Sequence, residues 1–242
     1  AFDIAGKSGL YFHWGQKKSQ ITAPVTNTIA SEDDDEQPVF SEEAVSEHLR
    51  FRYGHRWQRK VRLLLVMGNP DDVQKAAPGL CHDLWQEGDG NVLIYGGDAQ
   101  SLPDKIFLSK LKRLRSGQPV DGIIQVMSTS ALPTDSERDA FLRCRQKADH
   151  LLGWQAPVWL WLTDKAAGAQ QDAETAATGV IFGPEGTVKE AGKALTTLSQ
   201  HLQKAGMAQI LSNPAHDGLL QLSSRLRHEL KTSLTVLLSG LM

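Results

Sequence analysis

The sequence has few cysteines, no long apolar run and no marked excess of one charge. Cys81 and Cys144 are the only cysteines among 242 residues, too few for a disulfide framework and typical of a reducing compartment. No stretch reaches the roughly 18 uncharged apolar residues that a membrane span needs. Lysine and arginine number 26 against 28 aspartate and glutamate, which argues against a generally basic nucleic-acid or membrane-surface protein. We therefore expect a globular cytosolic protein whose basic sites are local patches.

The first 40 residues differ in composition from the rest of the chain. Residues 19–40 include five consecutive acids, from Glu32 to Glu36, and have no amphipathic period, so we expect a linker there. Residues 1–18 are too apolar for a free tail, and we expect them to pack on this domain or on a partner. The predicted organisation is an N-terminal extension over 1–40 and an α/β domain over 41–242.

From Ser41 onwards, helical patterns alternate with continuous apolar runs. The expected strands are Val61–Met67, Asn91–Tyr95, Gly122–Met127, Pro157–Thr163 and Gly179–Phe182. The expected helices are a capped, increasingly basic helix from Ser41, then Asp71–Gln86, Asp104–Ser116, Thr134–Leu152, Thr187–Ala205 and a last helix from His216. Continuous apolar strands that alternate with helices predict a doubly wound, mostly parallel sheet flanked by helices.

In such a sheet, ligands bind beyond the carboxyl ends of the strands, and the turn after the first strand is where a P-loop would hold phosphates. The eight residues at that position read GNPDDVQK, against the pattern GxxxxGK[ST]. Gly68 alone is retained. Gln74 takes the place of the lysine, and Lys75 stands where a hydroxyl would hold magnesium. The sequence therefore predicts a degenerate, P-loop NTPase-like fold.

Two further features of this turn oppose a bound phosphate. Pro70 removes a backbone N–H donor, and Asp71 and Asp72 bring negative charge. At about 4 Å and an effective dielectric of about 20, each carboxylate would repel a phosphate by about 4 kcal/mol. We expect no nucleotide, no other cofactor and no enzymatic activity. The two carboxylates suit the first turn of a helix.

The ends of the next strands also depart from a nucleotide site. Tyr95 stands where an acidic residue would hold magnesium, and Asp98 follows too late to lie at the strand end. The fourth strand ends Thr163-Asp164-Lys165-Ala166, which resembles a guanine-reading [NT]KxD motif without matching it. An NTPase that uses Lys75 and Asp98 at a non-standard phosphate site remains the alternative from the enzyme class.

The expected helix Asp104–Ser116 carries five bases and one acid. Ile106, Phe107, Leu111 and Leu114 are spaced as one buried face, which would leave the bases exposed. This surface is the candidate contact for an acidic partner or anionic lipid, and the alternative is a merely solvated helix. Its candidate partner-binding residues are Lys105, Lys110, Lys112, Arg113 and Arg115.

A second basic stretch runs from Arg50 to Arg62 and has Phe51, Tyr53 and Trp57 between its arginines. Aromatic side chains among arginines can stack single-stranded bases, so a nucleic-acid-binding module is a further alternative. A helix whose bases lie near its C-terminus and complement the helix dipole is the favoured interpretation. We therefore expect no nucleic-acid partner.

Three other patterns are weaker. Residues Ala1–Ser8 fit the relaxed form [AG]xxxxGK[ST], but no strand precedes them, and we do not expect a P-loop there. Cys81-His82-Asp83 contains the letters of a thiol triad, yet adjacent helical residues diverge, so a chance match is expected. The histidines show no HxxxH spacing, and we propose no metal site.

Three segments together resemble the cytoplasmic domain of the TssM/IcmF family, the inner-membrane component of bacterial type VI secretion. They are RYGHRWQRKVRLLLVMG, FLSKLKRLRSGQPVDGIIQVMS and APVWLWLTDKA, and the resemblance covers roughly residues 41–170. Its most specific part is Phe107–Ser128. Family members with intact motifs carry a GTPase-like domain, and this chain resembles a branch whose P-loop has decayed.

The resemblance implies a docking role without nucleotide hydrolysis. It places the domain at the cytoplasmic face of the bacterial inner membrane, held by flanking segments outside this chain. The implied partners are baseplate proteins and other membrane-complex subunits. Residues 1–18 would then follow a transmembrane helix, and the apolar stretch that ends at Met242 would lead towards the next one.

Overall fold

The computed structural model describes residues 8–13, 39–98, 104–163, 178–182, 187–212 and 217–241. It has an α/β fold with a mostly parallel sheet flanked by helices, as the sequence predicts. The strands are β1 (Ser8–His13), β2 (Arg62–Met67), β3 (Trp85–Gly88), β4 (Asn91–Tyr95), β5 (Gly122–Ser128), β6 (Val158–Thr163) and β7 (Thr178–Phe182). The main helices are α1 (Glu42–Tyr53), α2 (Pro70–Ala76), α3 (Leu80–Asp83), α4 (Lys105–Leu114), α5 (Asp135–Leu152), α6 (Val188–Ser212), α7 (Gly218–Arg225) and α8 (Lys231–Leu241).

The chain divides into two compact units, which we describe separately. One unit comprises residues 18–123 and 144–156, and we call it the β2 unit. The other comprises residues 1–17, 124–143 and 157–242, and we call it the β6 unit. Both β5 and α5 cross from one unit to the other. The predicted division at residue 40 stays a prediction, because residues 14–38 lie outside the described residues.

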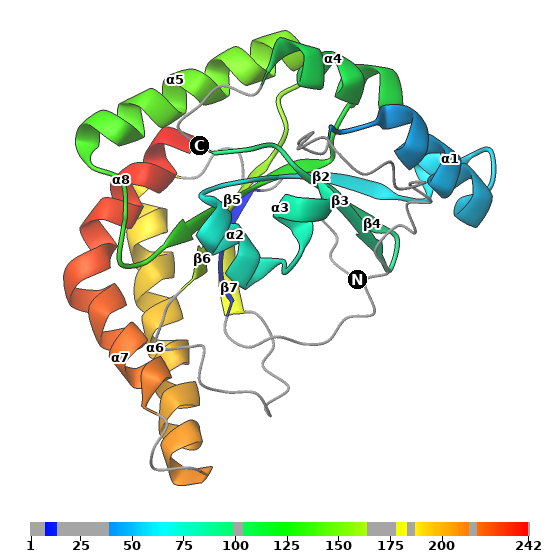
Figure 1. Cartoon of the computed structure of the whole chain (residues 1–242). Helices are drawn as coiled ribbons and strands as arrows, with labels where there is room; N and C mark the ends of the chain where they lie inside the picture. The colour runs from blue at the N-terminus through cyan, green and yellow to red at the C-terminus, as the bar shows by residue number, and fades with distance from the viewer. Residues whose placement is uncertain are drawn as a thin grey trace, which may run out of the picture. The chain divides into compact units, whose positions relative to one another are not determined.

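In the β2 unit, the strands lie in the order β3-β4-β2. β2 and β4 are parallel, with Leu63 opposite Val92 and Leu65 opposite Ile94, and all four side chains are fully buried. Burying one such aliphatic side chain is worth about 2 kcal/mol, so this pair of strands is the core of the unit. α3 contacts β3 and β4, and α1 contacts α4 (Figure 1).

The single helix expected over Asp71–Gln86 is wrong. The structure has α2, then α3, and then the strand β3, which pairs antiparallel with β4. Pro78 lacks the N–H that a continuing helix needs, and Gly79 has a φ of +83°, so α2 ends at Ala76 and α3 starts only at Leu80. β3 lies at the edge of the strand order and is stabilised by pairing with a later strand, which local pattern does not reveal.

The basic helix expected from Ser41 towards Arg62 is also shorter than predicted. The side chain of Ser41 caps α1 by accepting a hydrogen bond from the Ala44 amide at 3.3 Å. The helix ends before Gly54, whose φ of +81° lies in the left-handed region and whose N–H donates to the Arg50 carbonyl at 2.8 Å. A short 3₁₀ turn, η1 (Trp57–Arg59), follows and buries the Trp57 side chain.

In the β6 unit, the strands lie in the order β5-β6-β1-β7. β1 is parallel to β6 and antiparallel to β7. Residues 8–13 therefore pack on this domain, the first of the two alternatives for residues 1–18. They form a strand, whereas a P-loop at Ala1–Ser8 would open into a helix, which argues against that motif match.

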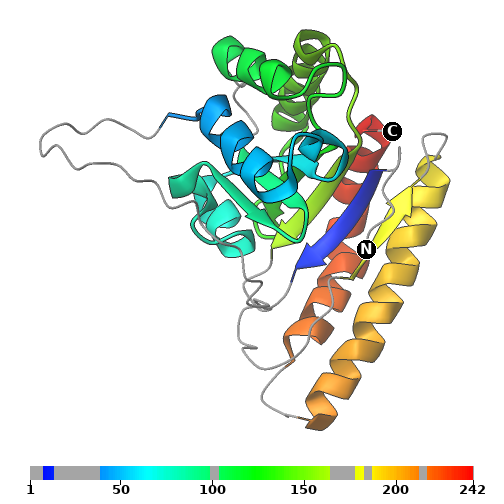
Figure 2. The same cartoon turned by 90° about the vertical axis from the view of Figure 1, so that its right-hand side faces the viewer.

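Long helices complete the β6 unit. α6 packs against β7, α7 and α8, and Figure 2 shows the adjoining helices α6, α7 and α8 beside the strands. The expected starts of α5 and α6 are confirmed, because Thr134 and Thr187 form reciprocal capping hydrogen bonds with Glu137 and Glu190. The last predicted helix consists of α7, the π-helical turn η3 (Leu226–Leu230) and α8. No helix within the described ranges has the length and hydropathy needed to cross a membrane.

Candidate functional site

The turn that follows β2 is much shorter than a phosphate-binding loop. Only Gly68 and Asn69 connect the end of β2 at Met67 to the start of α2 at Pro70. Asn69 accepts a hydrogen bond from the Asp71 amide at 3.0 Å through its side chain, and Pro70 occupies the first helical position, where no N–H is needed. The N–H groups that would face a phosphate are therefore partly removed and partly capped by the protein itself.

Gln74 and Lys75, the other residues singled out in the degenerate loop, serve the local structure of α2. The Gln74 side-chain carbonyl accepts a hydrogen bond from the Gly79 amide at 3.0 Å. The Lys75 ammonium pairs with the Asp72 carboxylate at 2.7 Å, one helical turn earlier. The charge of Lys75 is thus neutralised by Asp72, one of the two acids that the sequence analysis expected to repel a phosphate.

The carboxyl ends of β2 and β4 are joined directly to each other. The Gly68 amide donates to the Gly97 carbonyl at 3.0 Å, and the Gly96 amide donates to the Val66 carbonyl at 2.8 Å. A Cβ atom on Gly96 would lie 2.7 Å from the Cδ1 atom of buried Leu65, so the backbone here approaches the core more closely than a side chain allows. The backbones of the two strands therefore stay hydrogen-bonded to each other as far as Gly68 and Gly97.

Tyr95, which stands in place of the magnesium-binding acid, closes the same turn. Its hydroxyl donates a weak hydrogen bond to the Gly68 carbonyl at 3.4 Å. Burial, helped by the neighbouring Cys81 and Asp98 side chains, raises the pKa of Tyr95 to about 12. The phenol therefore stays protonated near neutral pH and offers no charge to a metal ion. Asp98 is exposed at the end of this segment.

The surroundings of Cys81 differ from those of a triad nucleophile. Its thiol lies 3.7 Å from the Pro70 carbonyl oxygen, and burial raises its pKa above the usual value. A reactive cysteine needs the opposite shift, because the thiolate is the nucleophile. His82 pairs with Asp83 at 2.9 Å, but its side chain is 89 % exposed. The expectation of a chance match is consistent with this geometry.

In the β6 unit, the carboxyl ends of β5 and β6 carry hydroxyl groups that are bonded to one another or to backbone. The Thr129 amide donates to the Thr163 carbonyl at 2.9 Å, and the Ser128 and Ser130 hydroxyls lie 2.7 Å apart. Arg225, from the end of α7, donates to the Thr129 carbonyl at 3.2 Å. These bonds hold the loop in place. Asp164 and Lys165, compared above with a guanine-reading motif, lie outside the described residues.

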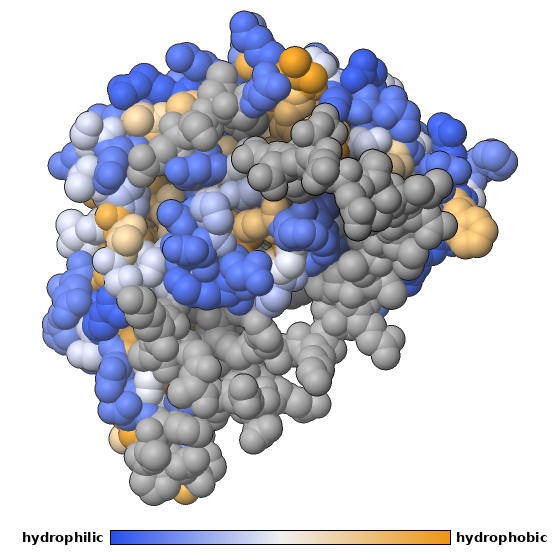
Figure 3. All heavy atoms as spheres, in the orientation of Figure 1, coloured by the Kyte–Doolittle hydropathy of each residue, from blue (hydrophilic) through white to orange (hydrophobic). Residues whose placement is uncertain are grey.

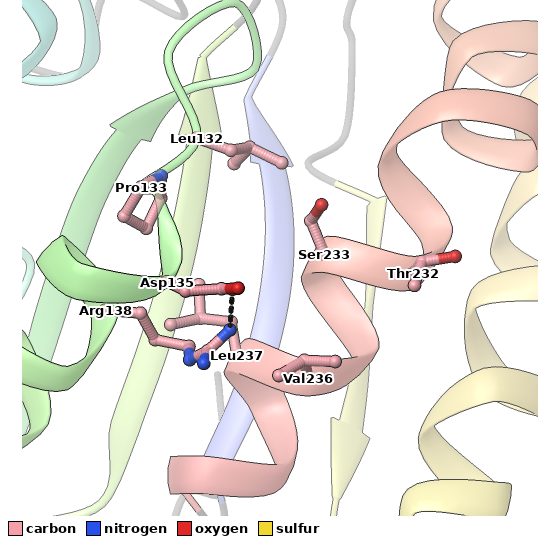
Figure 4. A pocket seen from close by; sticks show the side chains of 8 residues that line it. All are labelled: Leu132, Pro133, Asp135, Arg138, Thr232, Ser233, Val236 and Leu237. Carbon is pink, nitrogen blue, oxygen red and sulfur yellow. Dashed lines mark hydrogen bonds and ion pairs between the residues drawn. The ribbon is translucent and has the colours of Figure 1, made fainter.

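One small hollow lies between the start of α5 and α8 in the β6 unit. Its volume is about 110 Å³, against the roughly 300–1,000 Å³ of a typical ligand pocket. Figure 4 shows Asp135 and Arg138 on its wall, joined by an ion pair of 2.7 Å. The remaining lining residues are Leu132, Pro133, Thr232, Ser233, Val236 and Leu237. The hollow has room for a few water molecules but not for a nucleotide.

The five candidate partner-binding bases of α4 are used in different ways. Lys105 is exposed, and Lys112 is exposed with its ammonium on the Leu151 carbonyl at 3.1 Å. Lys110 is half-buried and donates to the Phe40 carbonyl at 2.7 Å. Arg113 pairs with the buried Glu42 at 2.6 Å and thereby links α4 to the start of α1.

Arg115 corrects the expectation that all five bases lie on the exposed face. It follows the end of α4, is 9 % exposed and pairs with Asp121 at 2.8 Å. Asp121 also accepts the Leu63 amide at 2.7 Å, so the pair fixes the start of β5 beside β2. The predicted apolar face is wrong at Ile106 as well, which is 64 % exposed, whereas Leu108 is buried.

A buried charge cluster between α1 and β3 was missed at the sequence level. The Glu87 side chain is fully buried, pairs with Arg52 at 2.7 Å and accepts a hydrogen bond from the Tyr53 hydroxyl. His48 lies 3.7 Å from the same carboxylate and packs edge-on against the Trp85 ring. Glu87 directly follows the helix that was expected over Asp71–Gln86, so no sequence pattern indicated that it is buried. The cluster attaches the basic end of α1 to the edge strand.

The chain matches no protein-family model and no curated protein. Across the described ranges, no group of three or more histidine, cysteine or acidic side chains is placed to hold a metal ion. The resemblance to the TssM/IcmF family therefore rests on the three quoted segments alone.

Proposed function

We propose that this chain is a docking domain that works without nucleotide hydrolysis, on a fold related to P-loop NTPases whose phosphate site has been lost. The observation that carries the proposal is the two-residue turn Gly68-Asn69 ahead of Pro70. A P-loop needs a longer connection, so that successive amides can surround a phosphate. Here the neighbouring polar groups are bonded to each other, and a phosphate would have to break those bonds.

The proposed setting is the cytoplasmic face of the bacterial inner membrane, in a type VI secretion membrane complex. It rests on the resemblance of residues 41–170 to the TssM/IcmF family. Baseplate proteins and other membrane-complex subunits are the proposed partners. Membrane attachment would come from flanking segments outside this chain.

Calorimetric titration of the full chain with GTP, GDP and ATP in the presence of magnesium tests the loss of the phosphate site. We expect no binding heat. Micromolar binding of any of the three would overturn the proposal. An NTPase built on Lys75 further predicts nucleotide hydrolysis that disappears in Lys75→Ala, whereas we expect both proteins to be equally inactive.

Affinity purification from a bacterium with an active type VI system tests the docking role. We expect baseplate subunits to be recovered with the full chain, and no baseplate subunits in the eluate would contradict the setting. Lys105→Glu is the suitable surface variant on α4, because Lys105 is exposed. Reversal of Lys110 or Arg113 would disturb the contacts of α4 with Phe40 and Glu42 and would confuse folding with binding.

A further inference from the structure

The segment from the end of α1 to the start of β2 is strongly basic. Residues 48–69 contain no acid, and six lysines and arginines lie among them. Two of these six residues bond to other groups of the protein, and a third lies at the start of a buried strand. Arg52 pairs with buried Glu87, the Lys60 ammonium donates to the Tyr53 carbonyl at 2.9 Å, and Arg62 opens β2.

The other three, Arg50, Arg56 and Arg59, are exposed together with Phe51, and we call these four residues the arginine surface. Among the described residues, none of the three guanidinium groups lies within ion-pair distance of an acid. The Phe51 side chain is 93 % exposed, more than any other large apolar side chain in the part of the chain that the structure describes. On the face shown in Figure 3, hydrophobic atoms form only small, separate spots over α1 and α4.

Backbone hydrogen bonds fix the short segment between α1 and β2 that carries Arg56 and Arg59. Gly54 ends α1, and two consecutive turns follow, in which the Trp57 amide donates to the Gly54 carbonyl at 3.0 Å and the Arg59 amide to the Arg56 carbonyl at 3.1 Å. Residues three apart in a 3₁₀ turn lie on the same side, so Arg56 and Arg59 project together. The buried Trp57 ring fixes this turn to the core. The backbone that carries Arg56 and Arg59 is therefore fixed before any partner binds, and only their side chains must be ordered on binding.

The side chains available favour a protein partner over a nucleic acid. Single-stranded nucleic acids bind to successive exposed aromatic rings, but of the rings Phe51, Tyr53 and Trp57 only that of Phe51 is exposed. Arginine around one aromatic anchor is the composition enriched at protein interfaces and their hot spots. Arg50, Arg56 and Arg59 are exposed and have no acidic partner among the described residues, so they are open to pair with carboxylates of a ligand.

We infer that the arginine surface docks an acidic segment of a partner protein, in which an apolar side chain covers Phe51 and carboxylates pair with Arg50, Arg56 and Arg59. The inference rests on the proposed docking role and specifies the surface and the chemistry of the partner. It assigns to the end of α1 and the turn that follows it the contact that the sequence analysis placed on α4.

A random peptide library displayed on phage and panned against the full chain tests the chemistry. We expect the enriched peptides to be acidic and to contain one aromatic or large aliphatic residue. One enriched peptide, synthesised with a fluorophore, is then titrated with the protein and followed by fluorescence anisotropy. Enrichment without acidic residues would overturn the inference.

Matched variants locate the binding surface. We expect Arg56→Glu combined with Arg59→Glu to weaken peptide binding at least about tenfold, and Phe51→Ala to weaken it about tenfold. The charge-matched control is Lys189→Glu combined with Lys193→Glu on α6, and the apolar control is Leu211→Ala, at a side chain 87 % exposed. Both controls should bind as the unchanged protein does. Equal losses in the controls, or no loss in the arginine variants, would overturn the inference.

A single-stranded oligothymidylate serves as the competing probe. Tighter binding of this DNA than of the acidic peptide, lost in the arginine variants, would assign the surface to nucleic acid and overturn the inference. Nucleotide calorimetry is independent of this surface. If GTP binds and the peptide binds normally, only the loss of the phosphate site is refuted. If no nucleotide binding heat is measured and the peptide does not bind, only the docking role of the arginine surface is refuted.

Discussion

The turn after β2 and the arginine surface at the end of α1 use their polar groups in opposite ways. In the turn, Asn69, Gln74 and Lys75 all bond to groups of the same chain. On the arginine surface, Arg50, Arg56 and Arg59 project into solvent without acidic partners among the described residues. The polar groups after β2 are therefore engaged within the protein, whereas those of Arg50, Arg56 and Arg59 are open to solvent. Fold class alone does not reveal this difference, because it depends on the particular residues of each region.

The largest effect is expected from removing the anchor beneath the arginine surface. Glu87→Ala leaves Arg52 and the Tyr53 hydroxyl without their buried acceptor, and we expect the free energy of unfolding to fall by about 3 kcal/mol. Chemical denaturation measures the change. Glu47→Ala, at an exposed position of α1, is the control and should be nearly neutral. Equal losses in the two variants would mean that Glu87 does not anchor α1.

A second test adds a methyl group to the closed end of β4. In Gly96→Ala, the new Cβ would lie 2.7 Å from Leu65 Cδ1, and we expect a loss of about 1–2 kcal/mol from overpacking. Gly192→Ala adds the same atom on α6, where no neighbour lies within 4 Å, and should gain about 0.5–1 kcal/mol through higher helix propensity. A neutral Gly96→Ala variant would show that the closed turn has spare room.

Alkaline pH tests the contact of Tyr95 with this turn. The folded-state pKa of Tyr95 is raised to about 12 from 10.0, so above pH 10 the unfolded chain ionises while the folded chain keeps its proton. The unfolded state is thereby favoured, and stability should fall as the pH rises from 10 towards about 12. Tyr95→Phe should lack this part of the pH dependence in thermal unfolding. Identical alkaline profiles for the two proteins would contradict the assignment.

The smallest change in stability is expected at Lys75, the residue on which the alternative NTPase would depend. Lys75 is half-exposed and pairs with Asp72 along one helix, an arrangement worth less than about 0.5 kcal/mol. Lys75→Ala should therefore leave the thermal unfolding midpoint almost unchanged. A large loss of stability would mean that Lys75 has a structural role beyond this ion pair.

Much of the fold followed from the sequence because its strands are continuous apolar runs. Asn91–Tyr95 is confirmed at both ends, and the other expected strands differ from the structure by one residue at one end. β3 was missed because its stability comes from pairing with β4. β1 was missed because six residues beside a polar linker gave no distinct pattern.

The candidate site was predictable only in part. Pro70 and the two acids after Gly68 indicated a lost phosphate site from chemistry alone, but the shortness of the connection became visible only in three dimensions. The roles of the α4 bases depend on long-range partners, such as Asp121 for Arg115 and Glu42 for Arg113. The arginine surface was not predictable because the exposure of Phe51 and the burial of Trp57 are set by tertiary packing.

The edge position of β3 has a consequence for the behaviour of the protein at high concentration. An unpaired strand edge can recruit a strand from another molecule and start aggregation. β3 is only four residues long, and its Glu87 side chain is buried and bonded to Arg52 and Tyr53 of α1, which keeps α1 packed on this strand. The acid that secures α1 thus also protects the rim of the sheet, and its loss would favour self-association as well as unfolding.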